Sequence, residues 1–148
     1  MTGFARTAYK FWAAVVFVAV LVQIAAAGYG AFYADKHANA LSSKKFDHGF
    51  GLHIALGYIL FLATLLLLLF ALAARPGRTR VLQSLGLFLL VLLAIILALA
   101  GHSVPAVGAL HPLDALAVVG LSGYLAHAVR RSGPAVPAGR VALGSSSS

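Results

Sequence analysis

The sequence predicts an all-α protein, a transmembrane four-helix bundle that forms a single domain over residues 1–131. The first observation is composition: 61% of the 148 residues are hydrophobic and only 9% are charged, whereas roughly a quarter of the residues in a soluble domain are charged. The second is the presence of four apolar stretches, each close to the ~20 residues that cross a bilayer as a helix. Short polar segments separate the stretches, so the length fits one bundle.

The first predicted span, residues 11–33, follows the basic residues Arg6 and Lys10 and contains one strongly polar side chain, Gln23. Residues 25–28 are small, as at a signal-peptide cleavage site, but the apolar run is too long for a signal peptide. We therefore expect the first span to stay in the protein as a helix.

The second predicted span, residues 50–73, is aliphatic at its centre, where the sequence reads LLLLLF. Asp47 lies just before it and is expected to cap the helix, because a carboxylate accepts hydrogen bonds from the free amides of a first turn. The basic segment RPGRTR, residues 75–80, follows the span. It contains the proline and glycine typical of a tight turn.

The third and fourth predicted spans cover residues 81–100 and 110–129. His111 and Pro112 begin the fourth span, and proline suits the first position of a helix because it has no amide hydrogen to donate. The tail, 132–148, is expected to be flexible, and its final GSSSS is typical of an added linker.

The basic residues are distributed as expected for a membrane protein of defined orientation. One side of the membrane would hold both termini, the 75–80 turn and eight basic residues, and the other side would hold three. The positive-inside rule then predicts a multi-pass protein of the bacterial inner membrane with both termini cytoplasmic. The net charge of +8 therefore favours anionic membrane lipids over nucleic acid as a partner. The eight are Arg6, Lys10, Arg75, Arg78, Arg80, Arg130, Arg131 and Arg140, and the three are Lys36, Lys44 and Lys45.

Five of the six histidines fall at or near the outer face in this topology: His37, His48, His53, His102 and His111. His53 is the strongest candidate ligand, because it lies inside the second span, where a polar side chain is costly. Gly57 lies one turn further on the same helix face and would leave space for a flat cofactor beside the backbone. The alternative is a histidine that only hydrogen-bonds a neighbouring carbonyl.

His111 is the second candidate ligand, at the start of the fourth span. Asp114, three residues further on, is expected to cap this helix; the alternative is that its carboxylate orients the His111 ring. His53 and His111 both enter their spans from the outer face and so lie at similar depth. Two imidazoles that face each other across a bundle can hold one heme iron through one nitrogen each. The macrocycle would then lie roughly along the membrane normal.

The remaining histidines have weaker assignments. His48 and His102 are alternative ligands, proton relays or interface anchors near the same site. Lys44, Lys45 and His48 are candidates for contact with the heme propionates. His127 lies about 24 Å along a helix from the outer site and cannot belong to it.

Other classes of function find little support. The chain has no cysteine, which excludes disulfides, thiolate metal sites and covalent c-type heme. It has no Walker loop, dinucleotide fingerprint, nucleophile elbow or HExxH motif, and with three acidic residues we assign no catalytic residue. Two alternatives to heme stay open. One is an accessory or structural membrane subunit without a cofactor, and the other is an outer-face transition-metal site drawn from Asp47, His48, His53, His102 and His111.

The order of these motifs resembles one four-helix half of the heme A synthase family, and small bacterial four-span proteins of the same pattern. The resemblance is carried by Gln23 and Gly28 in the first span, HIALGY from His53 in the second and LHPLDAL around His111 in the fourth. In that family, histidines near the outer ends of the second and fourth helices of each half bind heme. The resemblance therefore implies that His53 and His111 are axial ligands.

The chain corresponds to one half of that family's bundle and has no glutamate in its first outer loop, where Asp47 is the nearest acid. We therefore expect a single non-covalent heme b that serves electron transfer or heme handling, rather than heme A synthesis. The expected partner is a redox protein or a second copy of the chain. Two copies would rebuild a full bundle, with the small residues 25–28 as a contact face.

Overall fold

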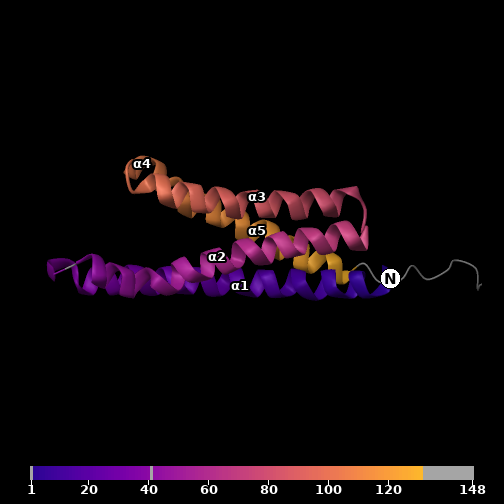
Figure 1. Cartoon of the computed structure of the whole chain (residues 1–148), viewed down its shortest axis with the longest axis horizontal. Coiled ribbons are helices and arrows are strands. Elements are labelled where there is room, and N and C mark those ends of the chain that lie inside the picture. Colours follow the sequence, from indigo (N-terminus) through magenta and orange to yellow (C-terminus); the bar gives the residue numbers. More distant parts are fainter. Residues whose placement is uncertain (1, 41, 132–148) are drawn as a thin grey trace, which may run out of the picture.

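In the computed structural model, which describes residues 2–40 and 42–131, every regular element is helical. Four helical segments are long and apolar enough to cross a membrane, which confirms the predicted four-helix class (Figure 1). The predicted tail, 132–148, lies outside the described residues. The elements in order are α1 (Thr2–Lys36), η1 (Ala38–Ala40), α2 (Ser43–Ala74), α3 (Arg78–Gly101), α4 (Pro105–Gly108) and α5 (Leu110–Arg131).

The four long helices pack as the corners of a square. α1 packs against α2 and α5, and α3 also packs against α2 and α5. α2 and α5 are therefore diagonal to each other, as are α1 and α3. One end of the bundle contains the connection between α2 and α3 and the arginines at the end of α5, and we call it the basic end. The opposite end, which contains η1 and α4, is the histidine end (Figure 1).

α1 and α2 are longer than the predicted spans. They have 35 and 32 residues, whereas α3 has 24, and at ~1.5 Å per residue the first two exceed a hydrocarbon core of ~30 Å. Their extra turns extend past α4 at the histidine end (Figure 1). These turns stay paired because Phe50 packs on Gly30 and Tyr33 packs on Gly49. The polar segment between the first two predicted spans, residues 34–47, is therefore mostly helical.

The hydrophobic core fills the half of the bundle at the basic end. Its buried polar groups are paired: the hydroxyls of Tyr9 and Ser84 lie 3.1 Å apart, and Trp12 Nε1 donates to the Ala63 carbonyl oxygen at 2.8 Å. Towards the histidine end this core stops at a layer to which each long helix contributes one residue: Val20, Leu60, Val91 and Val118. All four of these residues also line a cavity. The bundle is therefore packed with side chains on the basic-end side of this layer and contains a cavity on the histidine-end side.

The helix starts differ from three sequence predictions. Ser42, not Asp47, caps α2, because its backbone is extended and its side chain accepts a hydrogen bond from the Lys45 amide at 3.4 Å. Proline begins α4 at Pro105, whereas α5 begins before Pro112, at Leu110. Asp114 consequently lies beyond the first turn of α5 and does not cap it.

A close backbone contact fixes the turn between α3 and α4. A β-carbon added to Gly101 would lie 2.8 Å from the Gly108 α-carbon, and one added to Gly108 would lie 2.9 Å from the Gly101 α-carbon. Such separations are shorter than van der Waals contact, so both positions require glycine. This contact sets where the chain enters α5.

We expect Gly101→Ala to destabilise the protein by about 1–3 kcal/mol, because the added methyl forces α4 away from α3. Gly120→Ala is the matched control, since nothing lies within 4 Å of a β-carbon at that helical position. Thermal unfolding of both variants in one detergent measures the difference. Equal unfolding temperatures would contradict the close contact.

Candidate functional site

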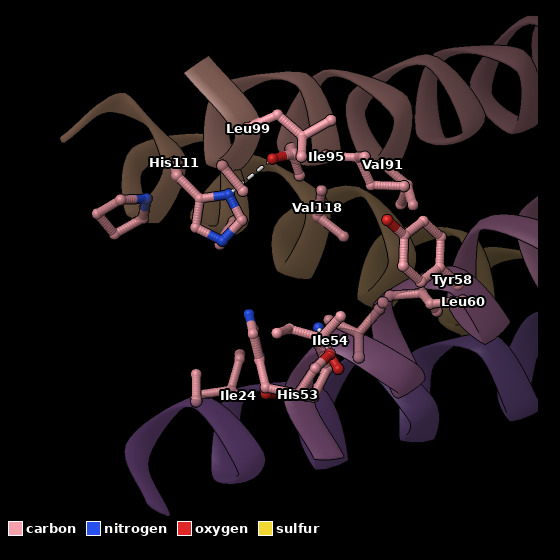
Figure 2. Close-up of a pocket in the computed structure, with 18 of the residues that line it drawn as sticks. Ile24, His53, Ile54, Tyr58, Leu60, Val91, Ile95, Leu99, His111 and Val118 are labelled. Carbon is pink, nitrogen blue, oxygen red and sulfur yellow. Dashed lines mark hydrogen bonds between the residues drawn. The ribbon is translucent and has the colours of Figure 1, made fainter. Parts of the chain in front are cut away.

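His53 and His111 face each other at the histidine end of the bundle. They come from the diagonal helices α2 and α5, and their ring centroids lie 6.1 Å apart with an angle of 83° between the ring planes. Figure 2 shows them on opposite walls of the cavity, with the open space between them. The two residues that the sequence singles out are thus brought together by the fold.

Each of the two rings is tied to the helix beside it through one nitrogen. His53 Nδ1 donates to the Gln23 carbonyl oxygen on α1 at 3.2 Å, and His111 Nδ1 donates to the Ala94 carbonyl oxygen on α3 at 2.8 Å. A carbonyl oxygen can only accept, so Nδ1 of each neutral ring carries the hydrogen. Nε2 of each ring is therefore left with its lone pair free to bind a metal ion.

A small residue makes each of these carbonyl groups accessible. In a helix the side chain four residues further on lies over the carbonyl oxygen, because side chains tilt towards the N-terminus. Those positions are Ala27 after Gln23 and Ala98 after Ala94, and both alanines line the cavity. The methyl groups leave space for an imidazole to approach the carbonyl from the side.

For His111, the hydrogen-bond partner is the Ala94 carbonyl oxygen and not the Asp114 carboxylate considered from the sequence. The Asp114 carboxylate does not orient His111, whose Nδ1 is bound to Ala94. Asp114 is nevertheless buried, with 8% of its surface exposed, and its Oδ2 has no hydrogen-bond partner. It is a buried carboxyl group one turn from a candidate ligand. For His53 the sequence offered a bond to a neighbouring carbonyl as the alternative to ligation, and the structure contains such a bond, to Gln23. Which carbonyl it is could not be named, because every residue carries one.

The cavity between the rings has a volume of about 460 Å³, within the range of small-molecule and cofactor sites. Its walls are mostly apolar, and the Val20, Leu60, Val91 and Val118 layer forms its floor. Because the two histidines lie on one diagonal of the square, a flat molecule between them would direct its edges at α1 and α3. Small side chains line the cavity on these helices, at Ala27 of α1 and at Ala94 and Ala98 of α3.

The separation of the rings suits one shared metal ion. Two imidazoles that bind an ion from opposite sides, each with a metal–nitrogen distance of about 2 Å, have ring centroids roughly 6 Å apart. The observed 6.1 Å agrees with this value, and such ligation permits any angle between the ring planes. The donor atoms, the spacing and the apolar cavity thus fit a flat metal complex.

Gly57, which the sequence proposes as space for a cofactor, lines the cavity one turn after His53. It has a second role that the sequence did not indicate. A β-carbon there would lie 3.3 Å from Gln23 Nε2, which donates to the His53 carbonyl oxygen at 2.9 Å. Gly57 therefore leaves space for the Gln23 amide as well as for a ligand.

The other predicted site residues divide into two groups. His102 lines the cavity, and its side chain is exposed. His48 lies outside that lining, with its ring 5.2 Å from the Tyr33 ring, which also contacts His37. Lys44 and Lys45 belong to the first turns of α2 and likewise do not line the cavity. The fold therefore groups His53, Gly57, His102 and His111 and leaves His48 apart.

A site for a bare metal ion would need more ligands than the fold assembles. Among residues 2–40 and 42–131, no group of three or more histidine, cysteine or acidic side chains comes close enough to hold an ion. Structural and catalytic zinc sites use three or four protein ligands. The described part of the chain thus offers a pair of imidazoles without the additional donors that such an ion requires.

Comparisons with known proteins identify no relative of this chain. No protein-family model, no curated protein and no solved structure matches it. The resemblance to one half of the heme A synthase family therefore stays a prediction, and function is inferred from the residues and their geometry.

Proposed function

We propose that this protein binds one heme b non-covalently between His53 and His111 and uses it for electron transfer. The observation that carries the proposal is the facing pair of imidazoles, with ring centroids 6.1 Å apart and each Nδ1 held by a helix carbonyl. The apolar cavity between them supplies the space. Heme A synthesis is not part of the proposal.

A tetrapyrrole explains why two protein ligands suffice. A bound heme would supply four ring nitrogens of its own to the iron, so His53 and His111 would be the two protein ligands that it needs. The mostly apolar lining would exclude water from the faces of such a ring, and His102, which lines the cavity, would be a candidate for contact with a propionate. Lys44, Lys45 and His48, which lie outside the lining, are weaker candidates for that contact.

Bis-histidine ligation favours electron transfer over chemistry on a bound substrate. A heme held by both histidines would supply one-electron chemistry and would leave no ligand position for a substrate. The protein then acts through ligation, burial and nearby charge, all of which set the reduction potential. The buried carboxyl group of Asp114, one turn from His111, is a group that would affect this potential.

The orientation of the site follows from the charges at the basic end. By the positive-inside rule, we expect that end to face the cytoplasm. Five arginines lie at it: Arg75, Arg78, Arg80, Arg130 and Arg131. The heme would then lie near the outer face of a bacterial inner membrane, where a redox partner on that side can reach it. A second copy of the chain is the alternative partner, although Ala26 of the predicted contact face is already buried within one chain.

The purified protein is expected to show a Soret band and sharp α and β bands on reduction. His53→Ala and His111→Ala should each abolish or convert this spectrum, because each removes one axial ligand. His127→Ala and His48→Ala are the controls and should keep it. An unchanged bis-histidine spectrum in either ligand variant, or a colourless wild-type protein after supply of heme, would reject the proposal; the second result favours an accessory subunit without a cofactor.

Filling the cavity provides a test that keeps both histidines in the sequence. Ala98→Phe should cause loss of most of the bound heme, because the new ring occupies the α3 side of the space between the histidines. Ala117→Phe is the matched control, since this alanine is exposed on α5 and does not line the cavity. Heme content per protein, measured as the pyridine hemochrome, distinguishes them. Equal heme content in the two variants would place the cofactor elsewhere.

A further inference from the structure

We infer that Gln23 is a positioning residue for His53: its side-chain amide joins α1 to the backbone of α2 and thereby sets the direction of the His53 ring, and Gly57 leaves the space that this amide needs. The inference rests on the proposed heme site and extends it. The two hydrogen bonds involved join protein atoms only, so the positioning of His53 can also be tested in the protein without heme.

Gln23 and His53 are joined by two hydrogen bonds that run in opposite directions. The side chain of Gln23 donates through Nε2 to the main-chain carbonyl oxygen of His53 at 2.9 Å. The side chain of His53 donates through Nδ1 to the main-chain carbonyl oxygen of Gln23 at 3.2 Å. Each bond links a side chain to the backbone of the opposite helix. Together they fix both the spacing and the rotation of α1 and α2 at the depth of the ring.

The amide of Gln23 is costly where it lies. Gln23 Oε1 is buried and has no hydrogen-bond partner, and an unsatisfied buried acceptor destabilises a fold. The residues on either side of Gln23 in α1, from 11 to 28, include no other strongly polar side chain. A methionine of similar size would pack in this environment without that cost. The useful part of the side chain is therefore the Nε2 donor.

Gly57 supplies independent support. A β-carbon at this position would lie 3.3 Å from Gln23 Nε2, closer than ordinary van der Waals contact. The same test finds nothing within 4 Å at Gly51, which lies on the same helix. Among protein atoms, the one that an added β-carbon at Gly57 would meet is thus the donor nitrogen of the Gln23 amide.

The two candidate ligands are consequently held in different ways. His111 is tied to α3 by its own Nδ1 bond to the Ala94 carbonyl, and no side chain of α3 returns a bond to it. The direction of the His53 ring depends on a side chain, so substitution can change it. Because the ring planes of a bis-histidine ferric heme determine its electron paramagnetic resonance spectrum, that spectrum reports on the 83° angle between the rings.

The test uses the full-length protein in lipid nanodiscs and four variants: Gln23→Met, Gly57→Ala, the double variant, and Gly51→Ala as the matched control. Loss of one hydrogen bond predicts heme dissociation about three- to tenfold faster for Gln23→Met, with a changed electron paramagnetic resonance spectrum. Gly57→Ala should change both in the same direction. In the double variant Gly57→Ala should add less than it does alone, because the amide that it displaces is absent. Gly51→Ala should match the wild type.

Two results would overturn the inference. One is a Gln23→Met variant whose spectrum and dissociation rate equal those of the wild type while only its unfolding temperature changes, which would make Gln23 a purely structural residue. The other is an effect of Gly57→Ala that stays undiminished in the Gln23→Met background.

A measurement without heme separates this inference from the proposed function. Nitrogen-15 resonances of the imidazole should show His53 as the Nδ1–H tautomer in the wild type and a larger Nε2–H fraction in Gln23→Met. If the protein binds no heme but this change occurs, the proposed function fails and the positioning role stands. If heme binds and the His53 tautomer is the same in both proteins, the positioning role fails alone.

Discussion

The histidine end of this bundle depends on two carbonyl oxygens that each accept two hydrogen bonds. A helical carbonyl already accepts the amide four residues further on, and its second lone pair is usually unused. Between apolar side chains, an imidazole N–H that is left without an acceptor is costly. The Gln23 and Ala94 carbonyls provide that second lone pair. The direction of both rings, and hence the separation between them, follows from this use of the backbone.

The two bonds also divide the bundle into two pairs of helices. α1 holds the histidine of α2, and α3 holds the histidine of α5. The pairs are packed together below the valine and leucine layer and enclose the cavity above it. The packed hydrophobic core and the cavity therefore lie in different halves of the molecule. A cofactor held by both histidines would connect the pairs in the half where side chains do not.

Much of the fold follows from the sequence, because a bilayer accepts few alternatives to long apolar helices. The four spans, the class of fold and the meeting of His53 with His111 could all be predicted. The length of α1 and α2 could not be predicted. The polar residues between the first two spans extend these helices, and the extensions pack together through Phe50 on Gly30 and Tyr33 on Gly49. The expected cap of α2 failed for a related reason: Ser42 caps this helix because it starts at Ser43, four residues before Asp47.

The ring partners were the least predictable part of the candidate site. A carboxylate such as Asp114 stands out in a sequence, whereas a carbonyl group is present at every position. The available signal was indirect: an alanine follows four residues after both Gln23 and Ala94, and so leaves each carbonyl open. His48 was placed near the site because it precedes the second span, but the helical extension carries its side chain to Tyr33.

The connection Arg75–Gly77 has an effect at the far end of the molecule. It is so short that α2 and α3 must be level where it joins them, with Arg75 in the left-handed conformation (φ 48°) to close α2. α2 has 32 residues and α3 has 24, so the extra length of α2 lies entirely at the rim of the histidine end. That rim is stepped, with a tall side made by α1 and α2 and a low side made by α4 (Figure 1). The outermost turns of α1 and α2 at this rim therefore pair with each other beyond the level that α3 and α4 reach (Figure 1).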